Sequence, residues 1–246
     1  MGLQNFGTGV RAIVFGASGG LGSAFVETLA ADEAVTQVHA VSRSAVDVAS
    51  PKVRAHRCDP LDEHALGASI AEATADGPLH IAIVALGVLH GEGIAPEKTW
   101  RHVDAAVMAR VLEINTIAPT LIAKHVLPAL AKDRKSCLAL LSARVGSIGD
   151  NRLGGWVSYR ASKAALNMVI RTFSIELARV NKSASIMGLH PGTVETDLSQ
   201  PFRAGIPSAG LFTPRRSVID MLTVVDGADA SANGRVFDYS GKEISP

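Results

Sequence analysis

Tyr159 and Lys163 stand four residues apart in the run "SYRASKAALN", residues 158–167. On a helix this spacing places both side chains on one face. The pKa of free tyrosine is about 10, and a nearby ammonium group stabilises the phenolate and lowers that value. The pair therefore predicts a proton-transfer site in which Tyr159 is the general acid or base and Lys163 adjusts its pKa.

Three serines upstream of the tyrosine could complete such a site: Ser142, Ser147 and Ser158. Ser158 adjoins Tyr159 on the helix and points about 100° away from it, which argues against Ser158. Ser147 follows a glycine in an expected loop, where it would line a pocket. Ser142 ends an expected strand at the carboxyl edge of the sheet, where open α/β sheets bind ligands. We choose Ser142 to hold a substrate carbonyl, with Ser147 or no serine as open alternatives.

Asn115 is a third candidate, in the run "LEINTIAPTLIAK" with Pro119 four residues later. Proline has no N–H, so the carbonyl of Asn115 lacks its usual helical partner. That carbonyl is free to hold a water molecule. The alternative is an ordinary proline kink.

The run "VFGASGGLGSAF", residues 14–25, places Gly16, Gly20 and Gly22 between an expected strand and an expected helix. Glycines allow a tight turn and the close approach of a phosphate to backbone N–H groups, and the helix N-terminus adds partial positive charge. The spacing lacks the Lys-Ser/Thr ending of an ATP-type loop. It also differs from the usual Gly-x-Gly-x-x-Gly dinucleotide pattern, but the position of the loop after the first strand of an alternating chain favours a nucleotide site, with plain turn chemistry as the alternative.

The end of the second expected strand bears on the choice of cofactor. An acidic residue there would hold the adenosine ribose and repel a 2′-phosphate. This chain has Ser42 and Arg43 at that point and no carboxylate before Asp47. Because arginine grips phosphate with two parallel hydrogen bonds, the pattern favours NADP(H) over NAD(H). The alternative is a solvated surface arginine.

Apolar runs that alternate with helical stretches must position these residues. Strands are expected at 11–17, 36–43, 52–59, 79–87, 136–143, 183–191 and 234–240, and helices at 23–32, 61–74, 103–130, 159–179 and 215–228. Strands that are apolar throughout and alternate with helices imply a parallel sheet covered on both faces. We therefore expect a single α/β domain over residues 1–246, a doubly wound Rossmann-type sheet of about seven strands.

One irregular segment, at about 198–214, is rich in Gly, Pro and Phe and follows an expected strand end. We interpret it as a substrate flap. Its apolar side chains Phe202, Leu211 and Phe212 indicate a fairly apolar substrate.

Composition excludes several kinds of partner. The 246 residues carry a net charge of +1, which gives no general attraction to nucleic acid or to anionic membranes. We see no signal peptide and no apolar run of the roughly 18 residues that span a bilayer, so we expect a cytoplasmic protein. Cys58 and Cys137 are expected to be buried thiols rather than a disulfide. The eight histidines show no zinc-like spacing, so no metal site is expected.

The glycine spacing, the "SYRASKAALN" run and the run "HPGTVETDLS" (190–199) resemble the short-chain dehydrogenase/reductase family. The resemblance extends from Val10 to Phe237. The runs "RVGSIGDNRLGGW" and "GRVFDYSGKEISP" look most like its C-factor/sniffer-like branch. The resemblance implies an NADP(H)-dependent carbonyl reductase or alcohol dehydrogenase. It would act on a small-molecule carbonyl or alcohol, as a homodimer or homotetramer.

The resemblance also implies roles for particular residues. Tyr159 would give a proton to the carbonyl oxygen, and Lys163 would also hold the nicotinamide ribose. The carbonyl of Asn115 would hold a water that relays protons to the lysine, and Ser142 would steady the carbonyl. The residues implied to bind the cofactor are Gly16, Ser18, Gly20, Leu21, Gly22, Ser42, Arg43, Asp59, Ala85, Gly87, Tyr159, Lys163, Pro191, Gly192, Val194 and Thr196. As a loop residue before Pro60, Asp59 could equally serve a turn.

Two departures from the family pattern matter. Many members carry Asn-Asn-Ala-Gly after the fourth strand, whereas "VALGVLH" here keeps only Ala85 and Gly87. The branch normally reads Ser-Ser-x-x-Gly-Ser-Ile, and aligning on Gly146 places Ala143 at the catalytic serine. The missing hydroxyl favours a rival interpretation, a cofactor-binding signalling or regulatory protein of C-factor type with little turnover.

Overall fold

The structure of the chain, a computed structural model, describes residues 2–91, 93–202 and 210–246. Seven parallel strands form one sheet in the order β3-β2-β1-β4-β5-β6-β9. The strands are β1 (Val10–Phe15), β2 (Val35–Ser42), β3 (Val53–Arg57), β4 (Ile81–Val84), β5 (Ser136–Leu141), β6 (Ala184–His190) and β9 (Val236–Asp238). The order reverses at β1, as in Rossmann-like folds, so the expected fold class is confirmed.

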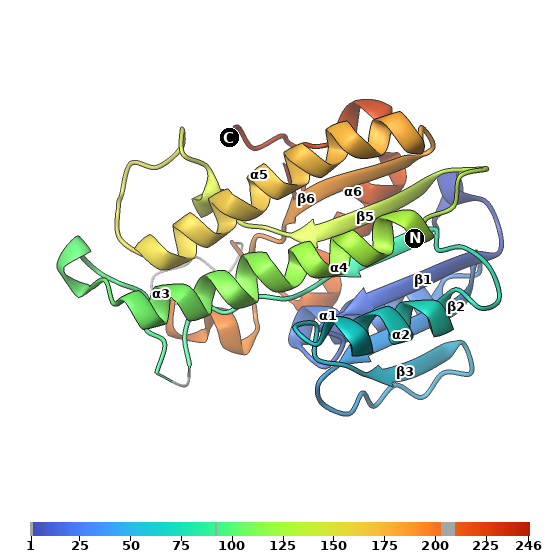
Figure 1. Cartoon of the computed structure of the whole chain (residues 1–246), viewed down its shortest axis with the longest axis horizontal. Coiled ribbons are helices and arrows are strands. Elements are labelled where there is room, and N and C mark those ends of the chain that lie inside the picture. Colours follow the sequence, from blue (N-terminus) through green and yellow to red (C-terminus); the bar gives the residue numbers. More distant parts are fainter. Residues whose placement is uncertain (1, 92, 203–209) are drawn as a thin grey trace.

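Helices cover both faces of the sheet (Figure 1). One face carries α1 (Gly20–Ala31) and α6 (Pro214–Gly227), and the other carries α2 (Glu63–Ala73), α4 (Ala118–Val126) and α5 (Val157–Val180). The helix α3 (Ala105–Leu112) continues the line of α4 beyond the carboxyl end of the sheet. A small second sheet pairs β7 (Thr193–Val194) with β8 (Leu211–Phe212).

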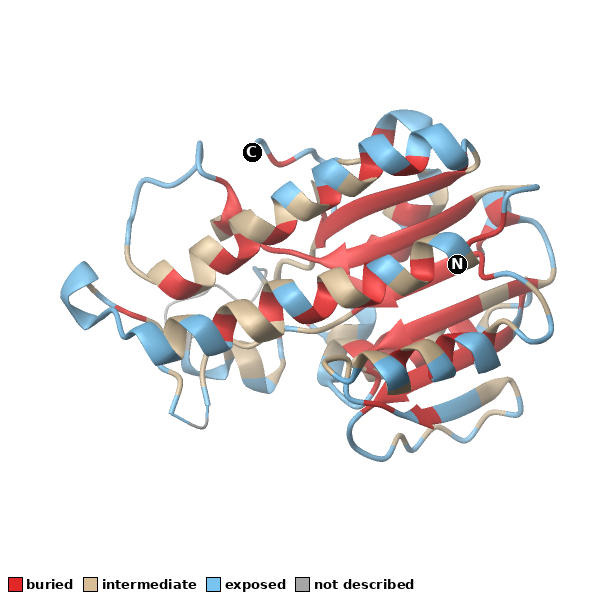
Figure 2. Cartoon of the chain, in the orientation of Figure 1, coloured by how far each residue is buried: buried red, intermediate tan, exposed pale blue. Residues whose placement is uncertain are grey.

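The core follows the two-residue period of the strands. In β1, Ala12 and Val14 pack with the α1 and α6 side, whereas Ile13 and Phe15 pack with the α2, α4 and α5 side. The strands are largely buried except for the edge strand β3, of which little is buried (Figure 2). Cys58 and Cys137 are free and buried, as the sequence predicted.

The helix expected over 103–130 is one continuous helical run, Ala105–Ala129, but its hydrogen bonding changes along its length. The structure has α3, a π-helical turn η3 (Glu113–Ile117), α4 and a short 3-10 turn η4 (Leu127–Ala129). The amide of Ala118 donates to the carbonyl of Glu113, a step of five residues. Pro119 cannot donate a helical hydrogen bond, which accounts for the break at this point.

Other boundaries also differ from expectation. The helix expected at 23–32 begins earlier, at Gly20, and the strand expected at 79–87 is only Ile81–Val84. The residues after β4 leave the sheet, which frees them to line a ligand site. Part of the predicted flap, residues 203–209 and the side chain of Phe202, lies outside the described residues.

Within the described residues, one helical run is long and apolar enough to cross a membrane by length and composition alone. It is Ala105–Ala129, with mean hydropathy 1.3. Core helices of globular proteins pass the same test. Its second half, α4, packs against β4, β5 and α2, and this packing accounts for much of its apolar character.

Candidate functional site

The turn between β1 and α1 requires glycine at two positions. Gly16 has a φ of +79°, and a Cβ there would lie 2.6 Å from the carbonyl oxygen of Ala85. A Cβ on Gly22 would lie 1.9 Å from the carbonyl oxygen of Gly16. The helix α1 then begins at Gly20 without a side-chain cap. Its first N–H groups therefore face the carboxyl end of the sheet with no helical partner.

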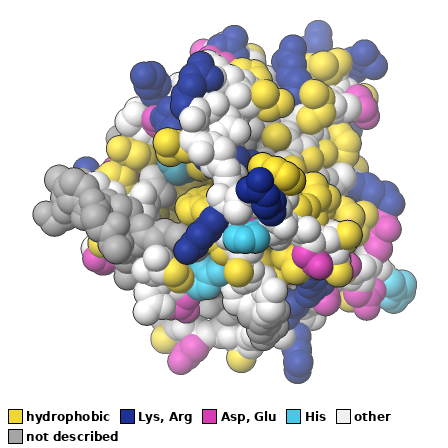
Figure 3. Space-filling model, turned by 90° about the vertical axis from the view of Figure 1, so that its left-hand side faces the viewer, with side chains coloured by type: hydrophobic (Ala, Val, Ile, Leu, Met, Phe, Trp, Pro, Cys, Tyr) yellow, Lys and Arg dark blue, Asp and Glu magenta, His cyan; other side chains and the backbone are white. Residues whose placement is uncertain are grey.

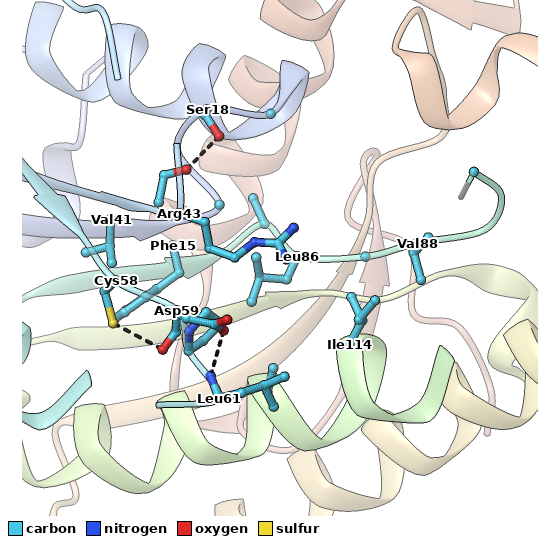
Figure 4. A pocket seen from close by; sticks show the side chains of 18 of the residues that line it. Phe15, Ser18, Val41, Arg43, Cys58, Asp59, Leu61, Leu86, Val88 and Ile114 are labelled. Carbon is cyan, nitrogen blue, oxygen red and sulfur yellow. Dashed lines mark hydrogen bonds between the residues drawn. The ribbon is translucent and has the colours of Figure 1, made fainter. Parts of the chain in front are cut away.

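A cavity of about 410 Å³ lies beside this turn (Figure 4). The hydroxyl oxygens of Ser18 and Ser42 are 2.6 Å apart at its edge. Arg43 extends into the cavity, and in the part of the chain that the structure describes no carboxylate pairs with it. Asp59 also lines the cavity, and its Oδ1 accepts from the amide of Leu61 at 3.1 Å. Asp59 thus stabilises a turn, which is the alternative that the sequence left open for this residue.

A second cavity of about 430 Å³ contains Tyr159, Lys163 and Ser142. The two cavities share lining residues around Ala85 and Gly87, so they are adjoining parts of one groove at the carboxyl end of the sheet. Figure 3 faces this end and shows hydrophobic, basic and histidine side chains around a hollow. Every residue predicted to bind the cofactor lines one or both cavities.

Tyr159 and Lys163 lie side by side on α5. Lys163 is 2% exposed, its Nζ donates to the carbonyl of Leu141 at 2.8 Å, and the same atom lies 5.9 Å from the centre of the Tyr159 ring. Burial lowers the pKa of Lys163 to about 8 and raises the pKa of Tyr159 to about 12. In the chain alone, burial thus raises the tyrosine pKa, and the expected lowering, which included the positive nicotinamide of a bound cofactor, stays a prediction.

Asn115 is fully buried and joins the segment after β4 to α5. Its Oδ1 accepts from the amide of Val88 at 2.7 Å, and its Nδ2 donates to the carbonyl of Val88 and to Ser162 Oγ. A Cβ on Gly87 would lie 3.5 Å from Lys163 Nζ and 3.7 Å from Asn115 Oδ1. The lysine and the asparagine thus meet at this glycine.

Ser142 lies in the same cavity as Tyr159. Ser142 directly follows β5, which ends at Leu141, and its amide still donates to the carbonyl of Leu189 in β6 at 2.8 Å. Its Oγ donates to Asn167 Oδ1 at 2.6 Å, a contact that sequence reasoning missed. To hold a substrate carbonyl, the Ser142 hydroxyl would have to leave Asn167 or share its hydrogen bond between Asn167 and the substrate.

The two other serines lie elsewhere. Ser147 is buried outside that cavity, and its Oγ accepts from the amide of Asp150 at 3.1 Å. Ser158 donates its hydroxyl hydrogen bond to Glu97, a buried residue of the segment between β4 and α3. Neither hydroxyl therefore shares the cavity with Tyr159. Glu97 was missed because nothing in its local sequence distinguishes it from a solvated carboxylate.

The Pro-Gly turn reaches the start of α1. Gly192 has a φ of +76°, and the carbonyl of Pro191 accepts from Ser217 Oγ at 2.7 Å. A Cβ on Gly20 would lie 2.9 Å from Thr196 Cγ2, so the threonine sits directly over the glycine turn. This contact places the residues 191–199 along one wall of the second cavity.

Leu211 and Phe212, predicted to face substrate, line neither cavity. Phe212 packs edge-to-face against Tyr239, with ring centres 4.6 Å apart. The aromatic ring is therefore part of the packing under the Pro-Gly turn. Within the described residues, no group of three His, Cys, Asp or Glu side chains could hold a metal ion.

A family model described as short chain dehydrogenase matches residues 11–206. The chain belongs to the short-chain dehydrogenase family. A related protein is the "C-signal" of Myxococcus xanthus, 41% identical over 142 residues, which are 58% of this chain and 80% of that protein. With a second relative, at 34% identity, the alignment covers 64% of that protein, so this short-chain dehydrogenase spans less than two thirds of its length.

Solved structures of this family show the same fold. The carbonyl reductase Sniffer of D. melanogaster has a TM-score of 0.84 at 21% identity, over 97% of this short-chain dehydrogenase and 100% of that chain. The NADPH-bound carbonyl reductase from chicken fatty liver has a TM-score of 0.83 at 26% identity, over 99% and 97% of the two chains. The predicted family and its C-factor/sniffer-like branch are confirmed.

Proposed function

We propose that this family member is an NADP(H)-dependent oxidoreductase that interconverts a small-molecule carbonyl compound and the corresponding secondary alcohol. The observation that carries the proposal is that Tyr159 and Lys163 line one cavity with Gly87, where Lys163 meets the buried Asn115, and that this cavity continues to Arg43. A proton donor and a phosphate-binding cation thus lie at the two ends of one groove. Its two adjoining parts, of about 410 and 430 Å³, suit the two halves of a dinucleotide.

The residues along the groove fit the cofactor. Gly16 and Gly22 leave space for a pyrophosphate against the first N–H groups of α1. Arg43 would take the 2′-phosphate, with Ser18 and Ser42 beside it. At the other end, Lys163 would hold the nicotinamide ribose. When bound, the nicotinamide supplies or accepts the hydride.

The chain's own residues supply the proton chemistry. With a pKa of about 12, Tyr159 is protonated at neutral pH and is ready to donate to a carbonyl oxygen. Lys163, with a pKa of about 8, is mostly an ammonium there and can stabilise the phenolate that remains. Asn115 fixes Val88 and Ser162 on either side of the lysine. Ser142 is the nearest candidate for steadying the carbonyl.

The test is NADPH oxidation, followed at its absorbance maximum, against a panel of aldehydes, ketones and diketones. Tyr159→Phe should leave NADPH affinity nearly intact and lower turnover by about 100-fold or more, the usual worth of positioned acid–base catalysis. Lys163→Ala should weaken both turnover and NADPH binding. The matched control is Tyr239→Phe, which changes the chain's other tyrosine. Near-normal turnover of Tyr159→Phe would exclude the mechanism.

A second candidate function is a cofactor-binding signalling protein with little turnover. Two observations favour it: Ala143 stands where the branch has its catalytic serine, and the relative in Myxococcus xanthus is named C-signal. NADPH binding without oxidation by any compound of the panel would support this candidate.

We further propose a cytoplasmic homodimer or homotetramer. Support for self-association comes from apolar side chains on the outer side of α5, where Met168 is 65% and Ile175 is 45% exposed. Light scattering coupled to size exclusion measures the mass directly. A monomer at micromolar concentration would refute the assembly.

A further inference from the structure

The residues that precede α5 have an unusual backbone. Gly154, Gly155 and Trp156 have φ values of 64°, 66° and 52°, and Trp156 is the one residue other than glycine with positive φ among the described residues. Glycine adopts this left-handed region freely, whereas a bulky side chain does so only under constraint. Such a strained backbone persists only where contacts with neighbouring groups enforce it, which is often at functional sites.

Glu97 holds this turn. Its carbonyl accepts from the amide of Trp156 at 2.6 Å, and its carboxylate accepts from the amide of Ser158 at 3.3 Å and from the Ser158 hydroxyl. Trp156 is the N-cap residue of α5 and offers no side-chain acceptor. Glu97, 4% exposed, therefore caps the helix from a distant segment, and its negative charge suits the positive end of a 24-residue helix.

The turn directs an aromatic ring at the tyrosine. The rings of Trp156 and Tyr159 meet edge-to-face, with centres 6.3 Å apart and planes at 75°. On the same ring, Lys163 Nζ lies 5.9 Å from the centre. Tyr159 thus has both an indole and an ammonium beside its ring, and the left-handed Trp156 carries the indole there.

Resting on the proposed function, we propose that Glu97 and Trp156 form a clip that positions the Tyr159 phenol for proton transfer and shields it from water. Both are positioning residues, since they act through Tyr159. The sequence contained a partial signal for the turn, the pair Gly154-Gly155. It contained none for Trp156 adopting the same conformation.

Trp156→Gly separates positioning from stability, because glycine relieves the backbone strain while it removes the indole. We expect the urea midpoint of unfolding to stay within error or rise, NADPH affinity to stay unchanged, and kcat to fall about 10- to 100-fold. Trp156→Phe keeps an aromatic edge and should recover most of kcat.

Glu97→Gln should lower kcat with little effect on NADPH affinity. Its matched control is Glu176→Gln, at an exposed carboxylate within α5, the helix that Glu97 caps.

A second readout does not depend on turnover. The chain has two tyrosines, so in Tyr239→Phe the tyrosinate absorbance near 295 nm reports Tyr159 alone. At pH 10.5, with folding checked by circular dichroism, adding Trp156→Gly should increase the tyrosinate signal several-fold, because the phenol loses its cover. An unchanged signal together with an unchanged kcat would overturn the clip. If the unsubstituted protein shows no turnover with any compound, the proposed function is refuted. The tyrosinate titration would then still test the clip.

Discussion

Arg43 is the residue on which the cofactor preference depends. Its guanidinium extends into the cavity beside the Ser18–Ser42 hydroxyl pair, and among the described residues no carboxylate pairs with it. A cation that follows β2 at this place attracts a phosphate and gains little from a plain ribose. The preference for NADP(H) over NAD(H) therefore stays a prediction about a single side chain.

Arg43→Ala should weaken NADPH binding by about 1.5–3 kcal/mol, the worth of a hydrogen bond to a charged group. NADH binding should change little, because NADH has no 2′-phosphate. Fluorescence titration with both cofactors measures the two affinities. Arg57→Ala is the control, since Arg57 pairs with Ser42 in the sheet register and lies outside the cavity. If Arg43→Ala weakens the binding of NADPH and NADH equally, Arg43 does not bind the 2′-phosphate.

Three variants test which serine, if any, holds the substrate carbonyl. If Ser142 holds the carbonyl, Ser142→Ala should lose about 10- to 1,000-fold in turnover, up to the loss of one oxyanion donor. Ser147→Ala should then be mild, because its hydroxyl is bound to the Asp150 amide. Ala143→Ser adds the hydroxyl that the branch usually has.

Steady-state kinetics with a substrate from the panel gives the ranking. A larger loss in Ser147→Ala would move the role to Ser147. If neither alanine variant changes turnover and Ala143→Ser raises it, the natural protein is a weakened reductase. That result would favour the signalling function.

Among the elements, the β1–α1 turn is the most tightly constrained. Gly22 belongs to the first turn of α1, yet a Cβ there would lie inside contact distance of the Gly16 carbonyl, which is backbone and cannot move aside. Gly67 in α2 is the contrast, since its Cβ would meet nothing closer than 3.7 Å. The same residue type is thus obligatory in one helix and replaceable in another.

Gly22→Ala should lower the free energy of unfolding by about 1–3 kcal/mol, the usual cost of overpacking, and should weaken NADPH binding as the turn opens. Gly67→Ala should be neutral or stabilise by up to about 1 kcal/mol, because alanine favours the helix. Urea denaturation of both variants measures the difference. Equal stability of the two would show that the turn adapts at little cost.

The elements also show what the sequence could predict. Apolar strands alternating with helices carry their own signal, so all seven strands of the main sheet were found, with ends wrong by a few residues. Pro119 predicted a disturbed hydrogen bond, yet the resulting π turn depends on packing against α5 and could not be derived locally. The contacts of Glu97 with Ser158 join residues 61 positions apart, and no local pattern encodes such a pair.

At the scale of the whole molecule, buried histidines couple stability to pH. His39 is fully buried, its Nδ1 lies 2.8 Å from His56 Nε2, and burial lowers its pKa to about 4. The pKa of His80 is lowered to about 4 by the same cause. The unfolded chain therefore binds more protons than the folded one between about pH 6.5 and pH 4, and stability decreases as the pH falls through this range.

The urea midpoint should be constant above about pH 7 and fall steadily from pH 6.5 to pH 4, with up to about 3 kcal/mol lost per buried histidine. His39→Asn should reduce this loss, since the asparagine does not titrate and can still bond to His56. His64→Asn, at an exposed position on α2, should leave the pH dependence unchanged. A flat midpoint over this range would show that the folded protein takes up as many protons as the unfolded chain, so burial would not hold these histidines neutral.

The order of the strands has a consequence for the protein during synthesis. The strands β1 to β4 form contiguous neighbours in the sheet, and β5, β6 and β9 then add one after another at the β4 edge. Roughly fifty residues separate β4 from β5, which a ribosome takes about 3–10 s to make. For that time the wholly apolar strand Ile81–Val84 is an open edge, and such edges pair with other chains. The nascent chain is thus exposed to aggregation, and can need a chaperone, while the residues from 85 to 135 emerge.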